Sequence, residues 1–112
     1  MIVNEKEVKI IAIDFDGTLC NECFPYIGAP RMDIINKCIE LKSRGIKLIL
    51  NTCRKDVYLK AAIDWCRGYG LEFDAANENL QCQIDVYGDC RKIGSDLFLD
   101  DKNISFENFL SL

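Results

Sequence analysis

The chain has 112 residues, which suits one domain with a single hydrophobic core, spanning residues 1–112. Hydrophobic residues make up 49% of the sequence, which excludes a disordered chain. The net charge of 14 − 18 = −4 does not favour non-specific nucleic-acid binding. No histidine is present, which excludes histidine-dependent nucleophile activation and histidine-ligated zinc.

Cysteine usage points to a reducing compartment. The chain has seven cysteines, an odd number, and its first residues do not combine a basic region with a following apolar stretch. We therefore expect free thiols and a cytoplasmic protein. The longest apolar runs are too short to span a membrane.

The first half of the chain predicts two buried strands joined by a loop and a helix. Residues 8–13 are a mostly β-branched run that suits a strand buried on both faces. Glycines and prolines between residues 17 and 30 indicate a loop. Pro30 can open a helix, and Gly45 is placed to end it. Residues 46–50 form the second predicted strand.

The second half predicts one further helix and two short strands. Residues 56–69 carry an apolar stripe at helical spacing. Residues 73–77 and 97–99 are short strand candidates, and residues 78–92 fit no single pattern. The tail from residue 104 to residue 112 is expected to form a short helix or a capping segment.

This alternation of strands and helices predicts a mostly parallel sheet with right-handed crossovers. Polar side chains follow three of its strands: Asp14 with Asp16, Thr52, and Asp100 with Asp101. Carboxyl ends of neighbouring parallel strands share one edge of the sheet, so we expect these side chains to converge there. Two carboxylates about 4 Å apart repel by roughly 4 kcal/mol at an effective dielectric of about 20. An all-oxygen site of this kind favours Mg²⁺.

The sequence Asp-Phe-Asp-Gly-Thr at residues 14–18 is the most specific motif. A chance match in a chain of this length is on the order of one in a thousand at average residue usage. A calcium-binding EF-hand does not fit, because Leu19 stands where that loop needs glycine. A simple turn would leave the second acidic pair unexplained. Thr52 and Lys92 add a hydroxyl and a positive charge that suit phosphate oxygens.

In their order along the chain, these signals resemble the four motifs of the haloacid dehalogenase (HAD) superfamily. Residues 14–18 match the first motif, Thr52 the second, Lys92 the third, and residues 97–101 the fourth. The stretch at residues 67–77 looks like that of small capless members from bacteria and phages. The resemblance covers nearly the whole chain. It implies an α/β fold, a three-layer Rossmann-like core with a mostly parallel sheet and no cap domain.

The resemblance also implies a hydrolase, a Mg²⁺-dependent phosphatase that forms an aspartyl-phosphate. Asp14 would attack phosphorus. Asp16 would protonate the leaving oxygen and then activate water, and its presence favours phosphoryl transfer over dehalogenation. Thr52 would hydrogen-bond the phosphoryl group, and Lys92 would balance its charge, with Arg91 as the alternative cation.

A metal site and a phosphate site follow from the same resemblance. The implied metal ligands are the Asp14 carboxylate, the Asp16 backbone carbonyl and Asp101, with Asp100 in support. The alternative is that Asp100 binds the metal directly. The residues expected to bind the substrate are Gly17, Thr18, Thr52, Arg54 and Lys92.

Neither connection that could hold a cap domain is long enough for one. Residues 21–44 are mostly needed for a helix, and residues 53–91 hold a helix, a strand and a short connection. We therefore expect an open site for a phosphorylated small molecule or a phosphorylated polymer end. A large substrate or a neighbouring subunit would cover the site, or small phosphates would react with modest specificity.

Two other functions compete with the phosphatase hypothesis. The first is a non-catalytic protein that keeps the site to bind a phosphate or a partner. The complete motif set argues against it. The second is a phospho-acceptor domain of the response-regulator type. In that architecture the acceptor aspartate follows a later strand, whereas here the aspartates at residues 14–18 follow the first.

Cys20 and Cys23 form a Cys-x-x-Cys pair, which we interpret as two thiols in the loop after the first motif. The alternatives are a redox pair, or half of a zinc site completed by Cys82 and Cys90. The seven-residue gap between these last two cysteines does not match a zinc knuckle.

The aromatic residues fall into two groups. Trp65 and Tyr69 lie on the apolar stripe of the second predicted helix, where we expect them to be core residues. Phe24, Pro25 and Tyr26 lie in the loop after the first motif, where an aromatic ring could contact substrate.

Overall fold

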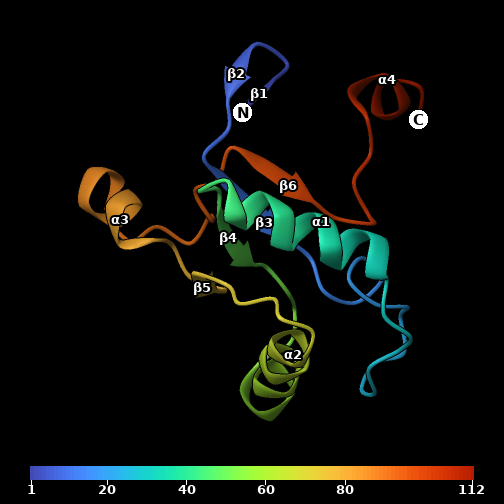
Figure 1. Ribbon diagram of the computed structural model, residues 1–112. Coiled ribbons are helices and arrows are strands. Elements are labelled where there is room, and N and C mark those ends of the chain that lie inside the picture. The colour runs from blue at the N-terminus through green and yellow to red at the C-terminus, as the bar shows by residue number, and fades with distance from the viewer.

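The strands β3 (Ile10–Ile13) and β4 (Lys47–Leu50) form the centre of the sheet, because their apolar runs can be buried on both faces. The computed structural model describes residues 1–112 (Figure 1). The sheet has four strands in the order β5-β4-β3-β6, with every neighbouring pair parallel. Its edges are the short strands β5 (Ala75–Ala76) and β6 (Leu97–Leu99).

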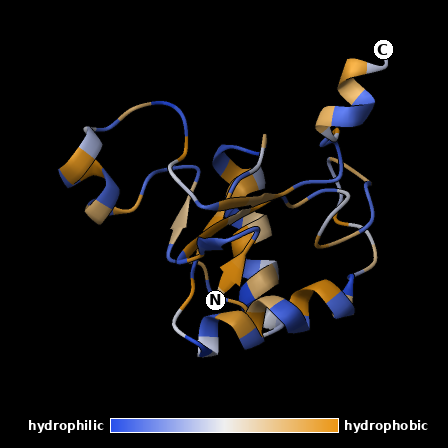
Figure 2. Ribbon diagram, turned by 90° about the horizontal axis from the view of Figure 1, so that it is seen from above, coloured by the Kyte–Doolittle hydropathy of each residue, from blue (hydrophilic) through white to orange (hydrophobic).

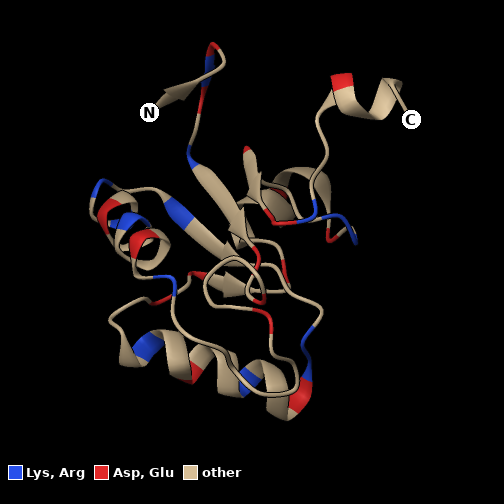
Figure 3. Cartoon of the chain, turned by 90° about the vertical axis from the view of Figure 1, so that its right-hand side faces the viewer, with Lys and Arg blue, Asp and Glu red and all other residues tan.

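The strand register brings the carboxyl ends of the central strands level. Ile13, the last residue of β3, pairs with Leu50 of β4 on one side and with Leu99 of β6 on the other. The loops that follow the three strands therefore begin beside one another. Figure 3 shows acidic residues on the loops beyond the arrow tips.

Two helices cover one face of the sheet. The helix α1 (Met32–Ser43) buries Ile35, Cys38 and Leu41, which recur at helical spacing, and α2 (Asp56–Gly68) buries Ala62 and Cys66. These side chains share one core cluster with the β3 and β4 residues of that face. In Figure 2 the strands are mostly hydrophobic, whereas α1 alternates between hydrophobic and hydrophilic residues.

The opposite face of the sheet is covered by the connection from β5 to β6. Ile10, Ala12 and Ile49 point to this face and pack against Leu80 and Ile93, on either side of the helix α3. The two earlier crossovers run over the α1 and α2 face, and this one returns over the other face. The result is the expected three-layer, Rossmann-like α/β fold, and no connection holds a cap domain.

Several details differ from the sequence-based expectation. The α1 helix begins at Met32 and not at Pro30, because Pro30 pairs with Cys20 in an isolated β-bridge. Trp65 packs against the core as expected, with its ring 5.5 Å from that of Phe15, but Tyr69 is 40% exposed and is not a core residue.

The structure also contains elements that the sequence pattern did not indicate. Strands β1 (Ile2–Val3) and β2 (Lys6–Glu7) form an antiparallel hairpin, and α3 (Gln81–Tyr87) lies in the stretch left unassigned. The helix α4 (Phe106–Leu110) buries no residue, so the tail does not cap the core. No helix has the length and apolar character needed to cross a membrane.

Leu48→Ala tests the core of the sheet. Leu48 is completely buried in β4, so the substitution leaves a cavity and should lower the free energy of unfolding by about 2–5 kcal/mol. Val57→Ala is the matched control, because Val57 is 72% exposed on α2 and its loss should cost less than about 0.5 kcal/mol. Urea denaturation measures both. Equal losses for the two variants would contradict the described core.

Candidate functional site

The candidate site lies at the point where the order of the strands along the sheet reverses. From β3 the chain reaches β4 over one face, and it returns to β6 on the other side of β3 over the opposite face. A crevice opens at such a switch point beyond the carboxyl ends of the strands. Asp14 follows β3, and its backbone N–H donates to the Leu99 carbonyl at the end of β6 (2.9 Å). Asp100 and Asp101 follow β6, so three carboxyl groups meet there.

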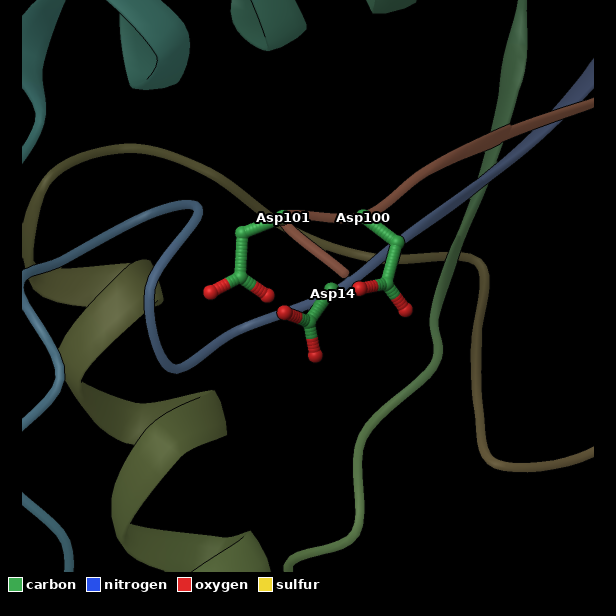
Figure 4. Close-up of side chains that lie close together, drawn as sticks. All are labelled: Asp14, Asp100 and Asp101. Carbon is green, nitrogen blue, oxygen red and sulfur yellow. The ribbon is translucent and has the colours of Figure 1, made fainter. Parts of the chain in front are cut away.

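Asp14, Asp100 and Asp101 form an acidic triad. A carboxylate oxygen of each residue lies within 4.8 Å of those of the other two. Figure 4 shows the three carboxylates gathered around one space, with Asp14 coming from the loop after β3 and the other two from the loop after β6. Oxygen donors so arranged fit a hard divalent cation such as Mg²⁺.

The environment of Asp14 makes its charged form costly. Burial raises the pKa of the Asp14 carboxyl to about 6, and the neighbouring Asp100 carboxylate adds to this increase. The Thr18 hydroxyl donates a hydrogen bond to Asp14 Oδ2 (3.1 Å), which partly opposes it. A cation bound to the triad would favour the charged form.

Gly17 makes room for Asp101. Its backbone has φ +86°, a left-handed conformation that favours glycine. A Cβ atom at this position would lie 2.2 Å from Asp101 Oδ2. The glycine of the first motif therefore allows the Asp101 carboxylate to approach the loop that carries Asp14 and Asp16.

Asp16 is bound by Arg54 and does not belong to the triad. The Arg54 guanidinium donates from Nε to Asp16 Oδ2 and from Nη2 to Asp16 Oδ1, both at 2.8 Å. Only 1% of the Arg54 side chain is exposed, and its charge also lies 5.1 Å from the centre of the Phe15 ring. This bidentate bond raises the pKa of the arginine and fixes the orientation of the Asp16 carboxylate.

Arg54 also organises the loop after the first motif. Its Nη2 donates to the Tyr26 carbonyl oxygen (2.9 Å), and its Nη1 donates to that of Pro25 (3.5 Å). The Phe24 ring packs 5.1 Å from the guanidinium and 5.3 Å from the Tyr58 ring. Four of its five N–H donors are used on the protein, although the residue also lines the open cavity. Its expected contact with substrate stays a prediction.

Thr52 is held by a residue that the sequence analysis did not single out. The Asn77 amide accepts a hydrogen bond from Thr52 N (2.8 Å) and donates one to the Arg54 carbonyl (3.0 Å). Thr52 Oγ1 accepts from the Arg54 N–H (3.2 Å). Asn77 has φ +54°, and an asparagine at a strand end that tolerates this conformation was the available sequence signal.

The site residues surround an open cavity of about 440 Å³. Its lining includes most of the predicted site residues, the Phe24 ring that could contact substrate, and three further residues, Glu22, Cys53 and Lys102. The predicted residues in the lining are Asp14, Asp16, Thr52, Arg54, Asp100 and Asp101. Gly17 and Thr18 are not among the lining residues. Each contacts a residue that is: Gly17 lies beside Asp101, and Thr18 donates a hydrogen bond to Asp14.

Lys92 is not brought to the triad. It is exposed and lines a different cavity, because Asn79 holds its segment on the other face of the sheet. The Asn79 side chain donates to the Lys92 carbonyl (3.3 Å) and accepts from the Gly94 N–H (2.6 Å). Arg91, the alternative cation, also lies outside the acidic cavity. The lysine that lines the acidic cavity is Lys102.

The two cysteines of the Cys-x-x-Cys pair have different environments. Cys20 is buried, and its thiol donates to the Phe15 carbonyl oxygen (3.8 Å). Burial raises the pKa of the Cys20 thiol, which disfavours the reactive thiolate. Cys23 is exposed. Cys20 therefore contributes to packing.

No protein-family model matches the sequence, and no curated protein matches it. A solved structure of a conserved protein from Bacteroides thetaiotaomicron is similar, with a TM-score of 0.79 and 38% sequence identity. The match covers 88% of this chain and 79% of the Bacteroides chain. Such identity over most of both chains indicates common ancestry as well as a common fold. The chain therefore belongs to the same family as this conserved Bacteroides protein.

Proposed function

We propose that the protein is a HAD-type phosphatase that depends on Mg²⁺ and hydrolyses phosphomonoesters through an aspartyl-phosphate. The observation that carries this proposal is the acidic triad, with Asp14 directly after the central strand and Asp16 held apart from it by Arg54. Two nearby aspartates in different environments suit two roles, one as nucleophile and one as proton donor and acceptor.

The oxygen atoms available at the site support a magnesium cofactor. The triad offers carboxylate oxygens from Asp14, Asp100 and Asp101. The Asp16 backbone carbonyl accepts no hydrogen bond from the protein, so its oxygen is free to serve as a further ligand. When bound, the cation would supply positive charge to the triad and to the phosphate. Both Asp100 and Asp101 are close enough to Asp14 to bind the same cation directly.

For each step of the proposed reaction, the site provides a residue that can perform it. The Asp14 carboxylate forms a bond to phosphorus while the bond from phosphorus to the leaving oxygen breaks, and Asp16 gives that oxygen a proton. Asp16 then takes a proton from the water that cleaves the aspartyl-phosphate. Thr52 donates a hydrogen bond to the phosphoryl group. Lys102 balances the negative charge of that group, which is the role expected for Lys92. Arg54 is a positioning residue for Asp16.

The open cavity favours substrates that themselves cover the site when they bind. A phosphorylated small molecule or a phosphorylated polymer end fits a cavity of about 440 Å³ without a cap domain. Phe24 is 52% exposed at its wall and offers one apolar contact to a leaving group. We place the reaction in the cytoplasm, as the unpaired cysteines suggest.

A non-catalytic phosphate-binding protein is the second candidate function. One observation favours it: both Asp16 oxygens are bound to Arg54, so the proton donor must share or leave that contact before it can reach a substrate. A panel of phosphomonoesters, nucleotides and phosphorylated polymer ends, assayed with Mg²⁺, separates the two functions. Binding without turnover across the panel would favour the second.

Asp14→Asn removes the proposed nucleophile. Turnover of an aryl phosphate in the presence of Mg²⁺ should fall by about a thousandfold or more, because no aspartyl-phosphate can form. The matched control is Asp33→Asn, which changes an exposed aspartate in the first turn of α1 and should leave the rate unchanged. A D14N variant that works at the wild-type rate would refute the mechanism.

The raised pKa of Asp14 predicts a dependence of stability on pH. Its value of about 6 lies above the ordinary 3.8, so the folded state binds this proton more tightly than the unfolded state does. In the presence of a chelator, ionisation of this carboxyl therefore lowers the free energy of unfolding progressively as the pH rises from about 4 to about 6. Asp14→Asn should be more stable than the wild type above that range, by about 1 kcal/mol after solvent screening, and equal to it near pH 4.

Thermal unfolding in chelator and in excess Mg²⁺ measures this difference. Mg²⁺ should stabilise the wild type and have little effect on the D14N variant, because the cation binds the folded triad. Equal stabilisation of both proteins by Mg²⁺ would show that the cation binds elsewhere.

Arg54→Lys tests the positioning of Asp16. Lysine keeps the charge but cannot make the bidentate bond, so turnover should fall by about tenfold or more while the protein stays folded. Arg44→Lys, at an exposed arginine after α1, is the control. The pH profile of turnover should also change, because the contacts of the proton-transferring residue have changed. An unaltered profile and rate would contradict the positioning role.

A further inference from the structure

One face of the sheet is incompletely covered. The helices α1 and α2 pack over β3 and β4, but no helix packs over β6 on this face. An open groove of about 320 Å³ lies between β6 and α1, and nine of its ten lining residues are hydrophobic. We call it the β6 groove. Its floor and walls include Ile11, Ile13, Ile34, Cys38, Leu41 and Leu97.

A second apolar surface lies on the C-terminal arm, residues 104–112. Four large side chains of this arm are strongly exposed: Phe106 (88%), Phe109 (61%), Leu110 (82%) and Leu112 (91%). The backbone hydrogen bonds of α4 and of the residues after it stay within the arm, and Figures 1 and 2 show α4 projecting away from the sheet and from α1. Apolar side chains grouped in this way mark an interaction site.

We propose that two copies of the chain exchange their C-terminal arms, so that each arm packs into the β6 groove of the other copy. A parallel sheet is normally buried on both faces, and the arm supplies the apolar cover that β6 lacks. Exchange of an identical element between two copies is a low-cost route to a symmetric dimer. This inference does not depend on the proposed function.

Charge complementarity supports a copy of this chain as the occupant. Lys37 of α1 is the one charged residue that lines the β6 groove. Glu107 is the one charged residue of the arm. Lys37 already pairs with Glu40 of the same helix (3.3 Å), and an arm whose apolar side chains face the groove can place Glu107 beside Lys37 as a second acidic partner.

The chain between β6 and the arm favours docking onto a second copy. The Asn103 side chain donates to the Phe98 carbonyl (3.4 Å), and the Lys102 N–H donates to Asp100 Oδ1 (2.9 Å). These bonds direct the chain outward, beyond the end of β6, whereas the groove lies alongside β6. To reach its own groove, the arm would have to reverse direction within residues 102–105, and the two bonds hold the first two of these residues.

The area involved suits a dimer that dissociates on dilution. The four exposed side chains of one arm carry about 500 Å² of surface, given the usual area of buried aromatic and large aliphatic residues. Two exchanged arms would together bring about 1,000 Å² of their own surface into the contacts, which is at the low end of specific interfaces.

The test is the molar mass measured by gel filtration with light scattering across the micromolar range. The wild type should be a dimer that dissociates on dilution. Phe109→Glu in the arm and Ile34→Glu in the groove should each weaken dimerisation by about tenfold or more, because each places a charge in the apolar contact. The control is Val86→Glu on α3, where a valine that is 70% exposed lies outside both surfaces and the dimer should persist.

Mixing the two variants identifies the occupant of the groove. A mixture of F109E and I34E chains keeps one intact arm facing one intact groove, so it should regain dimers that neither variant forms alone. Lys37→Glu combined with Glu107→Lys should likewise dimerise better than either single change. Both are exposed residues, so this pair tests the groove even if I34E fails to fold, which circular dichroism would reveal.

Three results would overturn the proposal. A wild type that stays monomeric across the range excludes the dimer. A fully dimeric F109E variant shows that copies associate without the arm. Monomeric single variants that stay monomeric when mixed, with the K37E and E107K changes failing to compensate each other, show that the arm does not exchange between copies.

Discussion

Electrostatic repulsion within the acidic triad is the constraint on which the rest of the site depends. Three carboxylates within 4.8 Å of one another repel when they are charged, and a bound cation would relieve that repulsion. The sheet imposes this arrangement, because the parallel register places the ends of β3 and β6 side by side. The surrounding residues accommodate it: Gly17 leaves space for Asp101, and the Thr18 hydroxyl donates to Asp14.

Arg54 separates the two aspartates of the first motif into different chemical environments. The Asp16 carboxylate receives two hydrogen bonds from a buried guanidinium, whereas Asp14 faces two other carboxylates. The same guanidinium binds the carbonyls of Pro25 and Tyr26, so the loop over the cavity and the Asp16 carboxylate share one anchor. A change in the position of that loop must therefore affect Asp16.

The sequence was most informative where structure is decided locally. The apolar runs and helical stripes identified β3, α1, β4 and α2, and the placement of polar residues after strands located the cavity. The contacts of Asn77, Asn79 and Lys92 were not predictable in this way. They depend on hydrogen bonds from side chains to backbone groups distant in the chain, which leave no periodic pattern. The Arg54 pair with Asp16 is likewise set by the fold, across 38 positions of sequence.

The edge position of β6 has a thermodynamic consequence for the site. Leu99 is 41% exposed, and β6 pairs with a single neighbour, so this strand can open locally more easily than the buried strand β3. Asp100 and Asp101 are attached to β6, whereas Asp14 is attached to β3. Local opening of the edge would remove two carboxylates from the third in one step. A cation bound to the triad would therefore stabilise β6, and an ordered β6 would in turn favour binding of that cation.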